Sequence, residues 1–200
     1  MRIGILGGTF DPPHIGHLVI AEEALEKLQL ERVYFVPAQQ PPHKLGELIS
    51  PFADRVAMLQ LALNANPAFT LSLIEANRPG PSYTVDTLRE LRREFPPEAE
   101  LFFVMGLDSL ANLPTWYHPH ELIELCQLAV LSRPGYTVDL DALEARIPGL
   151  RSRVVFIPAP ELDISSTELH ARVRAGHSIQ YMVPKEVARY IAEHRLYKNS

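Results

Sequence analysis

The feature that most restricts the fold is a regular alternation of short apolar runs with helical patterns. Six runs rich in branched and aromatic residues lie at 2–6, 32–36, 69–74, 100–105, 128–132 and 153–157. Between them apolar residues recur at helical spacing. Connections of this length join parallel strands, and strands covered on both faces read as continuous apolar runs. The pattern predicts an α/β fold with a doubly wound parallel sheet of five to six strands.

The helical patterns indicate which helix faces are buried. Pro51 follows Ser50 as a first-turn proline follows an N-cap, which predicts a helix start there. The predicted stripes are Ile15, Leu18, Val19, Leu25 and Leu28 in the first helix, Val56, Leu59, Ala62 and Leu63 in the second, and Val85, Leu88 and Leu91 in the third.

The pattern changes after residue 158. Residues 163–176 read as a loop, a capped helix and a stop, because Ser165 and Glu168 fit a capping box and Gly176 fits a helix end. A last helix is predicted to open at Pro184. We expect one domain over residues 1–200, with the sheet in 1–158 and a helical extension in 159–200.

Composition narrows the classes of partner. The net charge of −5 gives the chain no general attraction to nucleic acid or to an anionic membrane. Cys126 is the single cysteine, so no disulfide forms within the chain, and it is predicted to fill the core. No signal peptide or membrane-spanning run is recognisable, which fits a cytoplasmic protein.

Residues 4–25, GILGGTFDPPHIGHLVIAEEAL, pass from strand to helix through an unusual turn. Gly7 and Gly8 allow a sharp turn and close approach of a ligand, and Asp11 is a candidate cap for the helix. The helix N-terminus favours phosphate through its free N–H groups and its dipole. His14 and His17 lie on one side of the first turn, and the dipole predicts that both are largely neutral. We therefore predict a phosphate site.

Other interpretations of this turn fit less well. A structural zinc site is disfavoured, because His-x-x-His supplies two ligands and Asp11 is the only nearby carboxylate. The glycines form neither G-x-G-x-x-G nor a Walker A loop. A plain helix start with two surface histidines remains the alternative.

The sequence resembles the nucleotidyltransferase superfamily. GGTFDPPHIGH resembles its first signature, with the T/H-x-G-H element at residues 14–17, and ISST at 164–167 resembles its second. PPHK, SYTVDTL, MGLDSL, LPTWYHPHEL and SRPGY fall in order between them, and the whole set resembles bacterial nicotinate-nucleotide adenylyltransferases. That resemblance covers nearly the whole chain and implies a Rossmann-like core.

The resemblance implies an ATP side and an acceptor side. His14 and His17 would be catalytic and would contact the ATP phosphates, and Asp11 would fix the loop. The ATP-binding residues implied are Gly8, Thr9, Phe10, His14, His17, Gly106, Asp108, Ile164, Ser165, Ser166 and Thr167. Asp108 could also be a helix N-cap.

On the acceptor side, Lys44 and Arg133 would reach substrate phosphate. Tyr83 and Thr84 would lie beside the pyridine ring. Trp116 would stack on that ring, with backbone N–H groups near Tyr117 facing the nicotinate carboxylate. For Lys44 a solvated loop lysine, and for Trp116 a core-covering role, stay open.

The chain departs from the family at one position. The family usually places an arginine on the phosphate three residues after ISST, and this chain has His170. Histidine is shorter and cannot form a bidentate fork. Arg172 and Arg174 lie on nearby turns, so which of the three makes the contact stays open.

The implied reaction is adenylyl transfer from ATP to nicotinate mononucleotide, giving deamido-NAD and pyrophosphate in NAD biosynthesis. Mg²⁺ is expected as cofactor, bound mainly through ATP phosphates, with no dedicated protein metal site. ATP and nicotinate mononucleotide are the expected partners; the oligomeric state and the degree of nicotinate preference are left open. The alternatives are a pantetheine-phosphate adenylyltransferase, which is typically shorter and lacks the TWYHPHEL segment, an inactive nucleotide-binding regulator and, more weakly, a nucleic-acid-binding module.

Overall fold

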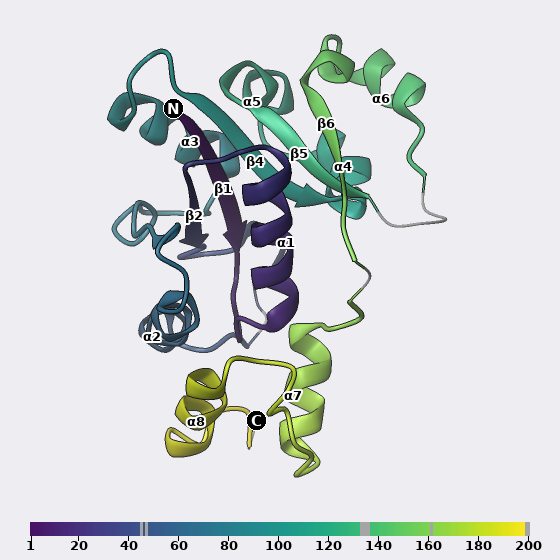
Figure 1. Ribbon diagram of the computed structural model, residues 1–200. Coiled ribbons are helices and arrows are strands. Elements are labelled where there is room, and N and C mark those ends of the chain that lie inside the picture. Colours follow the sequence, from purple (N-terminus) through teal and green to yellow (C-terminus); the bar gives the residue numbers. More distant parts are fainter. Residues whose placement is uncertain (45, 47, 133–136, 161, 199–200) are drawn as a thin grey trace.

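The computed structural model describes residues 1–44, 46, 48–132, 137–160 and 162–198. Six parallel strands form one sheet in the order β3-β2-β1-β4-β5-β6 (Figure 1). The strands are β1 (Arg2–Gly8), β2 (Arg32–Pro37), β3 (Phe69–Leu71), β4 (Glu100–Gly106), β5 (Gln127–Ser132) and β6 (Val154–Pro158). The predicted α/β fold is confirmed with six strands. The third strand is shorter than predicted, because residues 72–74 lie outside the sheet.

The strand order reverses beside β1. The chain moves outward from β1 through β2 to β3, and then returns to place β4 on the other side of β1. Ligands of open parallel sheets bind beyond the carboxyl ends of the strands at such a reversal. The turns after β1 and β4 are therefore the places to search for a site.

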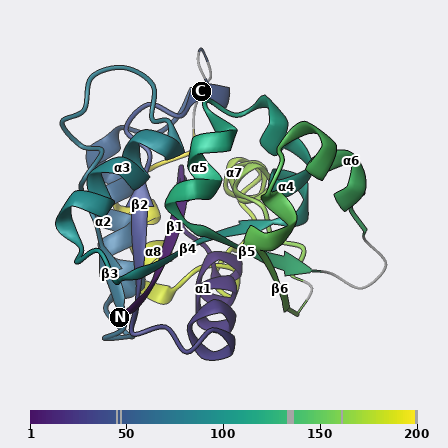
Figure 2. The same ribbon diagram turned by 90° about the horizontal axis from the view of Figure 1, so that it is seen from above.

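Helices cover both faces of the sheet. They are α1 (Ile15–Lys27), α2 (Phe52–Leu63), α3 (Thr84–Glu94), α4 (Leu107–Asn112), α5 (Pro119–Leu125), α6 (Leu140–Arg146), α7 (Ser166–Arg174) and α8 (Lys185–Glu193). Seen from above, α1 lies on one face and α3, α4 and α5 on the other (Figure 2). Short 3₁₀ helices lie at Pro42–Lys44, Leu113–Thr115 and Leu150–Arg153. Each face has its own apolar cluster.

The buried faces differ in part from the predicted stripes. The stripe of α3 is confirmed, since Val85, Leu88 and Leu91 are all buried. Leu28, at the C-cap of α1, is buried as predicted, but within the helix the buried positions are Ala21 and Ala24, because small side chains let it lie close to the sheet. In α2 the buried stripe is Arg55, Met58, Leu59, Ala62 and Leu63, and Val56 is only partly buried. This helix starts at Phe52 with Pro51 as N-cap, one residue later than predicted.

Residues 159–198, here called the C-terminal unit, lie at the carboxyl end of β1 and β2 (Figure 1). Their apolar cluster, which includes Leu169, Val187 and Ile191, also contains Met58 and Ala62 of α2. The cap at Ser165 is confirmed: its Oγ accepts from the N–H of Glu168 at 3.2 Å. Gly176 ends α7 with φ of 72°, also as predicted. Within the described residues no helix is long and apolar enough to cross a membrane.

Candidate active site

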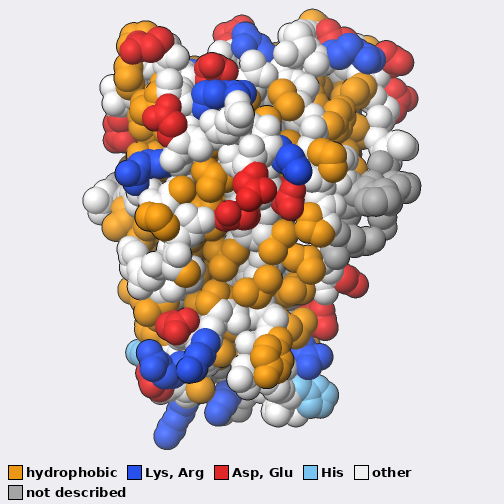
Figure 3. All heavy atoms as spheres, in the orientation of Figure 1, with side chains coloured by type: hydrophobic (Ala, Val, Ile, Leu, Met, Phe, Trp, Pro, Cys, Tyr) orange, Lys and Arg blue, Asp and Glu red, His pale blue; other side chains and the backbone are white. Residues whose placement is uncertain are grey.

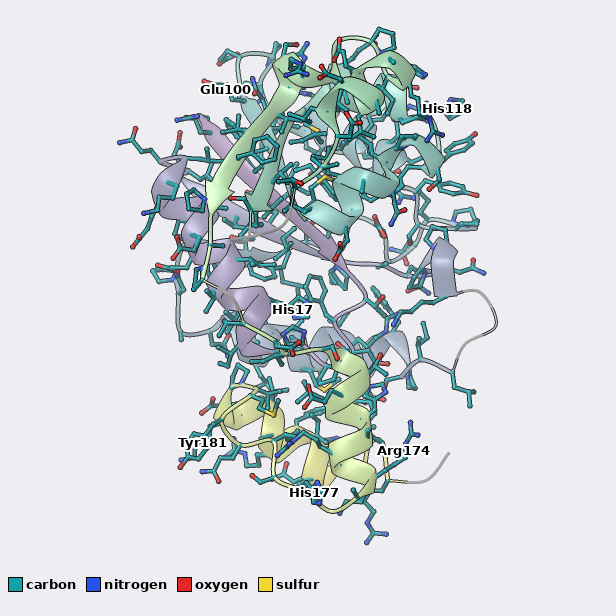
Figure 4. All side chains as sticks on the ribbon, turned by 90° about the vertical axis from the view of Figure 1, so that its right-hand side faces the viewer. His17, Glu100, His118, Arg174, His177 and Tyr181 are labelled. Carbon is teal, nitrogen blue, oxygen red and sulfur yellow. The ribbon has the colours of Figure 1, made fainter. Side chains whose placement is uncertain are left out.

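The turn between β1 and α1, residues 9–14, brings the two histidines together. The His14 and His17 rings stack with centroids 3.7 Å apart. Phe10 is buried, with φ of 50°, and its ring meets the edge of His17 at 5.0 Å. His17 lies where the start of α1 faces the C-terminal unit (Figure 4). The strand end, the turn and the helix therefore build one paired imidazole site.

The tautomer of His17 follows from its hydrogen bond. The backbone N–H of His14 donates to His17 Nδ1 at 3.1 Å. In the neutral imidazole, one nitrogen accepts and the other carries the proton. His17 therefore carries its proton on Nε2, which makes Nε2–H the donor of this ring.

Both histidines are neutral at physiological pH. Burial lowers the pKa of His14 to about 4. Burial also lowers the pKa of His17 well below its ordinary value, and charge on His14 would lower it further. The predicted neutrality is confirmed, but desolvation rather than the helix dipole is its main cause.

Asp11 does not cap α1, so that part of the prediction is wrong. Position 14 is the N-cap of this helix. The Asp11 carboxylate instead accepts from the N–H of Ser50 at 2.9 Å and from the hydroxyl of Tyr197 at 2.6 Å. It is 2% exposed and fixes the turn from two sides.

A cavity of about 210 Å³ opens beside the histidines. Its lining includes His14, Gly16, His17, Gly106 and Ile164, so the turns after β1 and β4 meet the ISST segment there. The N-terminus of α7, at Ser165–Ser166–Thr167, follows directly, and Ser166 Oγ donates to the carbonyl of Pro12 at 3.3 Å.

Two other residues predicted on the ATP side, Gly8 and Thr9, take part in the packing and hydrogen bonding that hold the turn. The Thr9 carbonyl accepts from Arg55 at 2.8 Å. A Cβ on Gly8 would lie 3.1 Å from the Phe10 ring, so the glycine makes room for that ring.

A second cavity, of about 540 Å³, gathers the predicted acceptor residues. Tyr83, Thr84, Trp116 and Tyr117 all line it. Tyr83 stacks on Tyr117 at 4.3 Å, and Trp116 meets the edge of Phe103 at 5.9 Å. The adjacent helices α3 and α5 are tied by Arg89, whose Nε donates to Glu121 Oε1 at 2.6 Å.

The remaining predicted residues near the second cavity are placed as follows: some differ from the prediction, and one lies outside the described residues. Asp108 lines the second cavity and sits in the first turn of α4, whose N-cap is Gly106, so the N-cap prediction is wrong. The backbone N–H of Trp116 donates to the Leu113 carbonyl at 3.0 Å, so this donor, one of those predicted for the nicotinate carboxylate, is already occupied. Lys44 ends a 3₁₀ helix whose first residue lines this cavity, whereas Arg133 lies outside the described residues.

Comparison with known proteins settles the family. The cytidylyltransferase-like family model matches residues 5–172. A probable nicotinate-nucleotide adenylyltransferase of Thermomicrobium roseum is 53% identical over 98% of this chain and 92% of its own length. One from Thermus thermophilus is 47% identical over 99% of this chain and 100% of its own. The chain belongs to the nicotinate-nucleotide adenylyltransferase family.

Solved structures extend the likeness in fold. The nicotinic acid mononucleotide adenylyltransferase of Plasmodium falciparum complexed with NaAD aligns with a TM-score of 0.81 at 19% identity, covering 100% of this chain and 98% of that one. At this identity the likeness concerns the fold alone.

The position of the family's usual arginine is used differently in this chain. His170 Nε2 lies 2.8 Å from the Asp11 carbonyl, and it must donate because a carbonyl only accepts. Burial lowers the pKa of His170, and this outweighs the charge of Asp11 and the hydrogen bond to its carbonyl, which raise that pKa. Neutral His170 therefore binds the turn. Arg172 donates to the Ser178 carbonyl at 3.0 Å and 3.2 Å, which leaves Arg174 and Lys44 as the candidate phosphate cations near this helix.

Arg55 is a site residue that the sequence analysis missed. It is 1% exposed and donates to the carbonyls of Thr9 and Ala38, each at 2.8 Å, and through Nε to that of Ser50 at 3.1 Å. Burial lowers its pKa, and the charge of Asp11 opposes that shift. The sequence did contain a sign of this role, because Arg55 lies at helical spacing before the apolar residues of α2 and so falls on the buried face of the helix.

Proposed function

We propose that this chain transfers the adenylyl group of ATP to nicotinate mononucleotide, giving deamido-NAD and pyrophosphate in NAD biosynthesis. The observation that carries the proposal is the pair of cavities at the reversal of the sheet. One holds the two histidines, the other holds the aromatic wall, and the turn after β4 contributes Gly106 to the first and Asp108 to the second. The relatives' names give the substrates.

The chemistry needs alignment and charge neutralisation. The acceptor phosphate is already an anion, so it can attack the α-phosphorus without a general base. His14 and His17 act as neutral donors to the phosphates, His17 through Nε2–H. Gly8, Thr9, Phe10, Gly106, Ile164, Ser165, Ser166 and Thr167 complete the proposed ATP side; Asp108, expected on the same side, lines the second cavity.

Mg²⁺ is the proposed cofactor and would neutralise phosphate charge during transfer. Both oxygens of Asp11 already accept hydrogen bonds. The described part of the chain contains no group of three or more His, Cys, Asp or Glu side chains suited to a metal. This donor set fits an ion that is held by ATP phosphates and water.

The acceptor side places the pyridine ring in the second cavity. Trp116 and Tyr83 offer aromatic faces, while Thr84, Tyr117, Lys44 and Arg133 complete the proposed set. Since the backbone N–H of Trp116 already donates to the Leu113 carbonyl, the proposed donors to the nicotinate carboxylate are the backbone N–H groups that follow it.

An inactive nucleotide-binding regulator is the main rival function, because it would keep the same cavities. A nucleic-acid-binding module has less support, since Lys and Arg mix with Asp and Glu on the face shown in Figure 3. We place the reaction in the cytoplasm, where a single free cysteine is ordinary.

The test is a substrate panel with ATP. Nicotinate mononucleotide should support steady pyrophosphate release, with kcat/KM about 10³-fold above nicotinamide mononucleotide, because an amide leaves a buried donor unpaired. Phosphopantetheine should be inert. In Trp116→Ala both pyridine acceptors should weaken by similar factors, because stacking does not distinguish them.

Each outcome of the panel has a clear meaning. Absence of pyrophosphate release from a folded, ATP-binding protein would favour the regulator. Equal kcat/KM for the two pyridine acceptors would refute the donor account. If Trp116→Ala lost the preference for nicotinate over nicotinamide mononucleotide, that preference would be assigned to the indole.

A further inference from the structure

Among the described residues, four hydrogen bonds join the C-terminal unit to the β1–α1 segment. Ser166 Oγ donates to the Pro12 carbonyl, His170 Nε2 to the Asp11 carbonyl and Tyr197 Oη to Asp11 Oδ1. The Ile15 N–H donates to the Met182 carbonyl at 2.9 Å. All four contacts fall on residues 11–15, directly before or at the start of the histidine helix.

Tyr197 contacts two residues of this hydrogen-bond network, Asp11 and His170. Its hydroxyl lies 2.6 Å from Asp11 Oδ1, and its ring stacks on His170 at 4.0 Å with an interplanar angle of 22°. The other Asp11 oxygen accepts from Ser50. Tyr197 thus fixes Asp11 directly, and fixes the ring that donates to the Asp11 carbonyl.

We infer that Tyr197 is a positioning residue for adenylyl transfer, acting through Asp11 and His170 on the turn that orients His14 and His17. Tyr197 lines neither described cavity, so it acts through other residues. The inference rests on the proposed function. A small displacement of a catalytic group can reduce turnover by large factors, because the reaction depends on alignment.

A purely structural role for Tyr197 is the competing explanation, and the chain supplies a matched control. Tyr190 belongs to the same unit and donates to Asp54 Oδ1 at 2.8 Å, which ties the unit to α2 instead of to the turn. Tyr181, also in this unit, is 89% exposed and points outward (Figure 4). Phenylalanine at each position removes one hydroxyl and keeps the ring.

The experiment compares Tyr197→Phe, Tyr190→Phe and Tyr181→Phe. Thermal unfolding shows whether each variant folds, and kcat and KM are measured with ATP and nicotinate mononucleotide. We expect kcat of Tyr197→Phe to fall about tenfold, with KM for nicotinate mononucleotide nearly unchanged. Tyr190→Phe should lose a similar amount of Tm and keep its kcat, and Tyr181→Phe should match the wild type.

A second readout does not depend on activity. The nitrogen chemical shifts of the imidazoles report the tautomer of His17 by NMR. They should show a clear Nε2–H form in wild type and Tyr190→Phe, and a mixed or shifted state in Tyr197→Phe. Wild-type protein without turnover would count against the proposed function, while the imidazole shifts would still test Tyr197. Unchanged shifts, or a kcat loss equal to that of Tyr190→Phe, would overturn the inference.

Discussion

His14 and His17, the residues proposed to contact the ATP phosphates, share one property and differ in another. Both are neutral because burial depresses their pKa, and His17 has its donor nitrogen selected by a backbone N–H. A neutral donor does not require a proton to be taken up before ATP binds. Activity that depends on these rings should therefore not decline as pH rises through the usual histidine range.

The same burial makes stability depend on pH. The pKa of His14 falls from its ordinary 6.5 to about 4 on folding, so the unfolded chain binds a proton that the folded chain does not. The part of the stability that comes from His14 is therefore lost as pH falls from about 7 toward 4, and it amounts to roughly 2 kcal/mol at about pH 5. Urea unfolding at the two pH values measures this loss.

Two variants show whether His14 is the source of that pH dependence. His14→Gln should reduce it by the contribution of His14 and leave that of His17 and His170, whose pKa burial also lowers, whereas His177→Gln, at an exposed position, should leave it unchanged. Equal pH dependence in wild type and His14→Gln would contradict the assignment.

Single residues differ in how well the sequence predicts them. His14 and His17 were predictable, because motif and helix spacing place them together. Asp11 was expected to fix the loop, as it does, or to cap the helix, which it does not; its partners are Ser50 and Tyr197, residues from distant segments that no local pattern could name. Arg55 binds backbone carbonyls, which every residue type carries, so no side-chain pattern could name its partners.

Among the elements, the first turn of α1 shows how a helix accommodates the site. A Cβ on Gly16 would lie 3.0 Å from His14 Nδ1. That ring is 8% exposed and stacked on His17, so a methyl group at position 16 would displace it by a few tenths of an ångström within the pair. The glycine that looks unfavourable in a helix leaves the neighbouring imidazole in place.

Gly16→Ala should separate stability from activity. Helix propensity alone would favour alanine by about 0.5–1 kcal/mol, and the displaced ring opposes that gain, so Tm should change little. The kcat/KM for ATP should fall by about tenfold or more, because both imidazoles are displaced. Thermal unfolding and steady-state kinetics measure the two effects, and a variant with unchanged kcat/KM would show that the ring tolerates the methyl group.

Element positions were largely predictable because the buried strands are continuous apolar runs. Helix faces were less so. The sequence pattern places Val56 on the buried face of α2, whereas the structure buries Arg55 and Met58 there. Arg55 is buried because backbone carbonyls from three loops meet at this end of the helix and accept its hydrogen bonds. For α1 the pattern overlooked the two alanines, because alanine contributes little to an apolar stripe.

At the scale of the molecule, Arg55 joins segments that the sheet alone would leave independent. It binds carbonyls after β1, after β2 and before α2. The cluster of the C-terminal unit also shares Met58 and Ala62 with α2. We propose on this basis that residues 1–200 form one domain, the core at 1–158 and the extension at 159–200 unfolding together.

Arg55→Met tests that proposal. It leaves the carbonyls of Thr9, Ala38 and Ser50 without their donor and removes the positive charge near Asp11, so the free energy of unfolding should drop by about 3–5 kcal/mol. Arg93→Met, on the exposed side of α3, should change it by less than about 0.5 kcal/mol. Circular dichroism and cleavage by protease follow the core and the extension; an extension that unfolds well before the core would contradict the single domain.

The contact between Asp11 and Tyr197 also has a consequence for biosynthesis. The two residues are 186 positions apart in the chain. A ribosome delivers the turn early and its tyrosine partner only after the strands and helices between them. Sheet formation can begin on the nascent chain, but the turn acquires its full set of hydrogen bonds only once residue 197 has emerged. A chain whose synthesis stops short of that residue would therefore release a folded sheet whose turn at residues 9–14 is incompletely ordered.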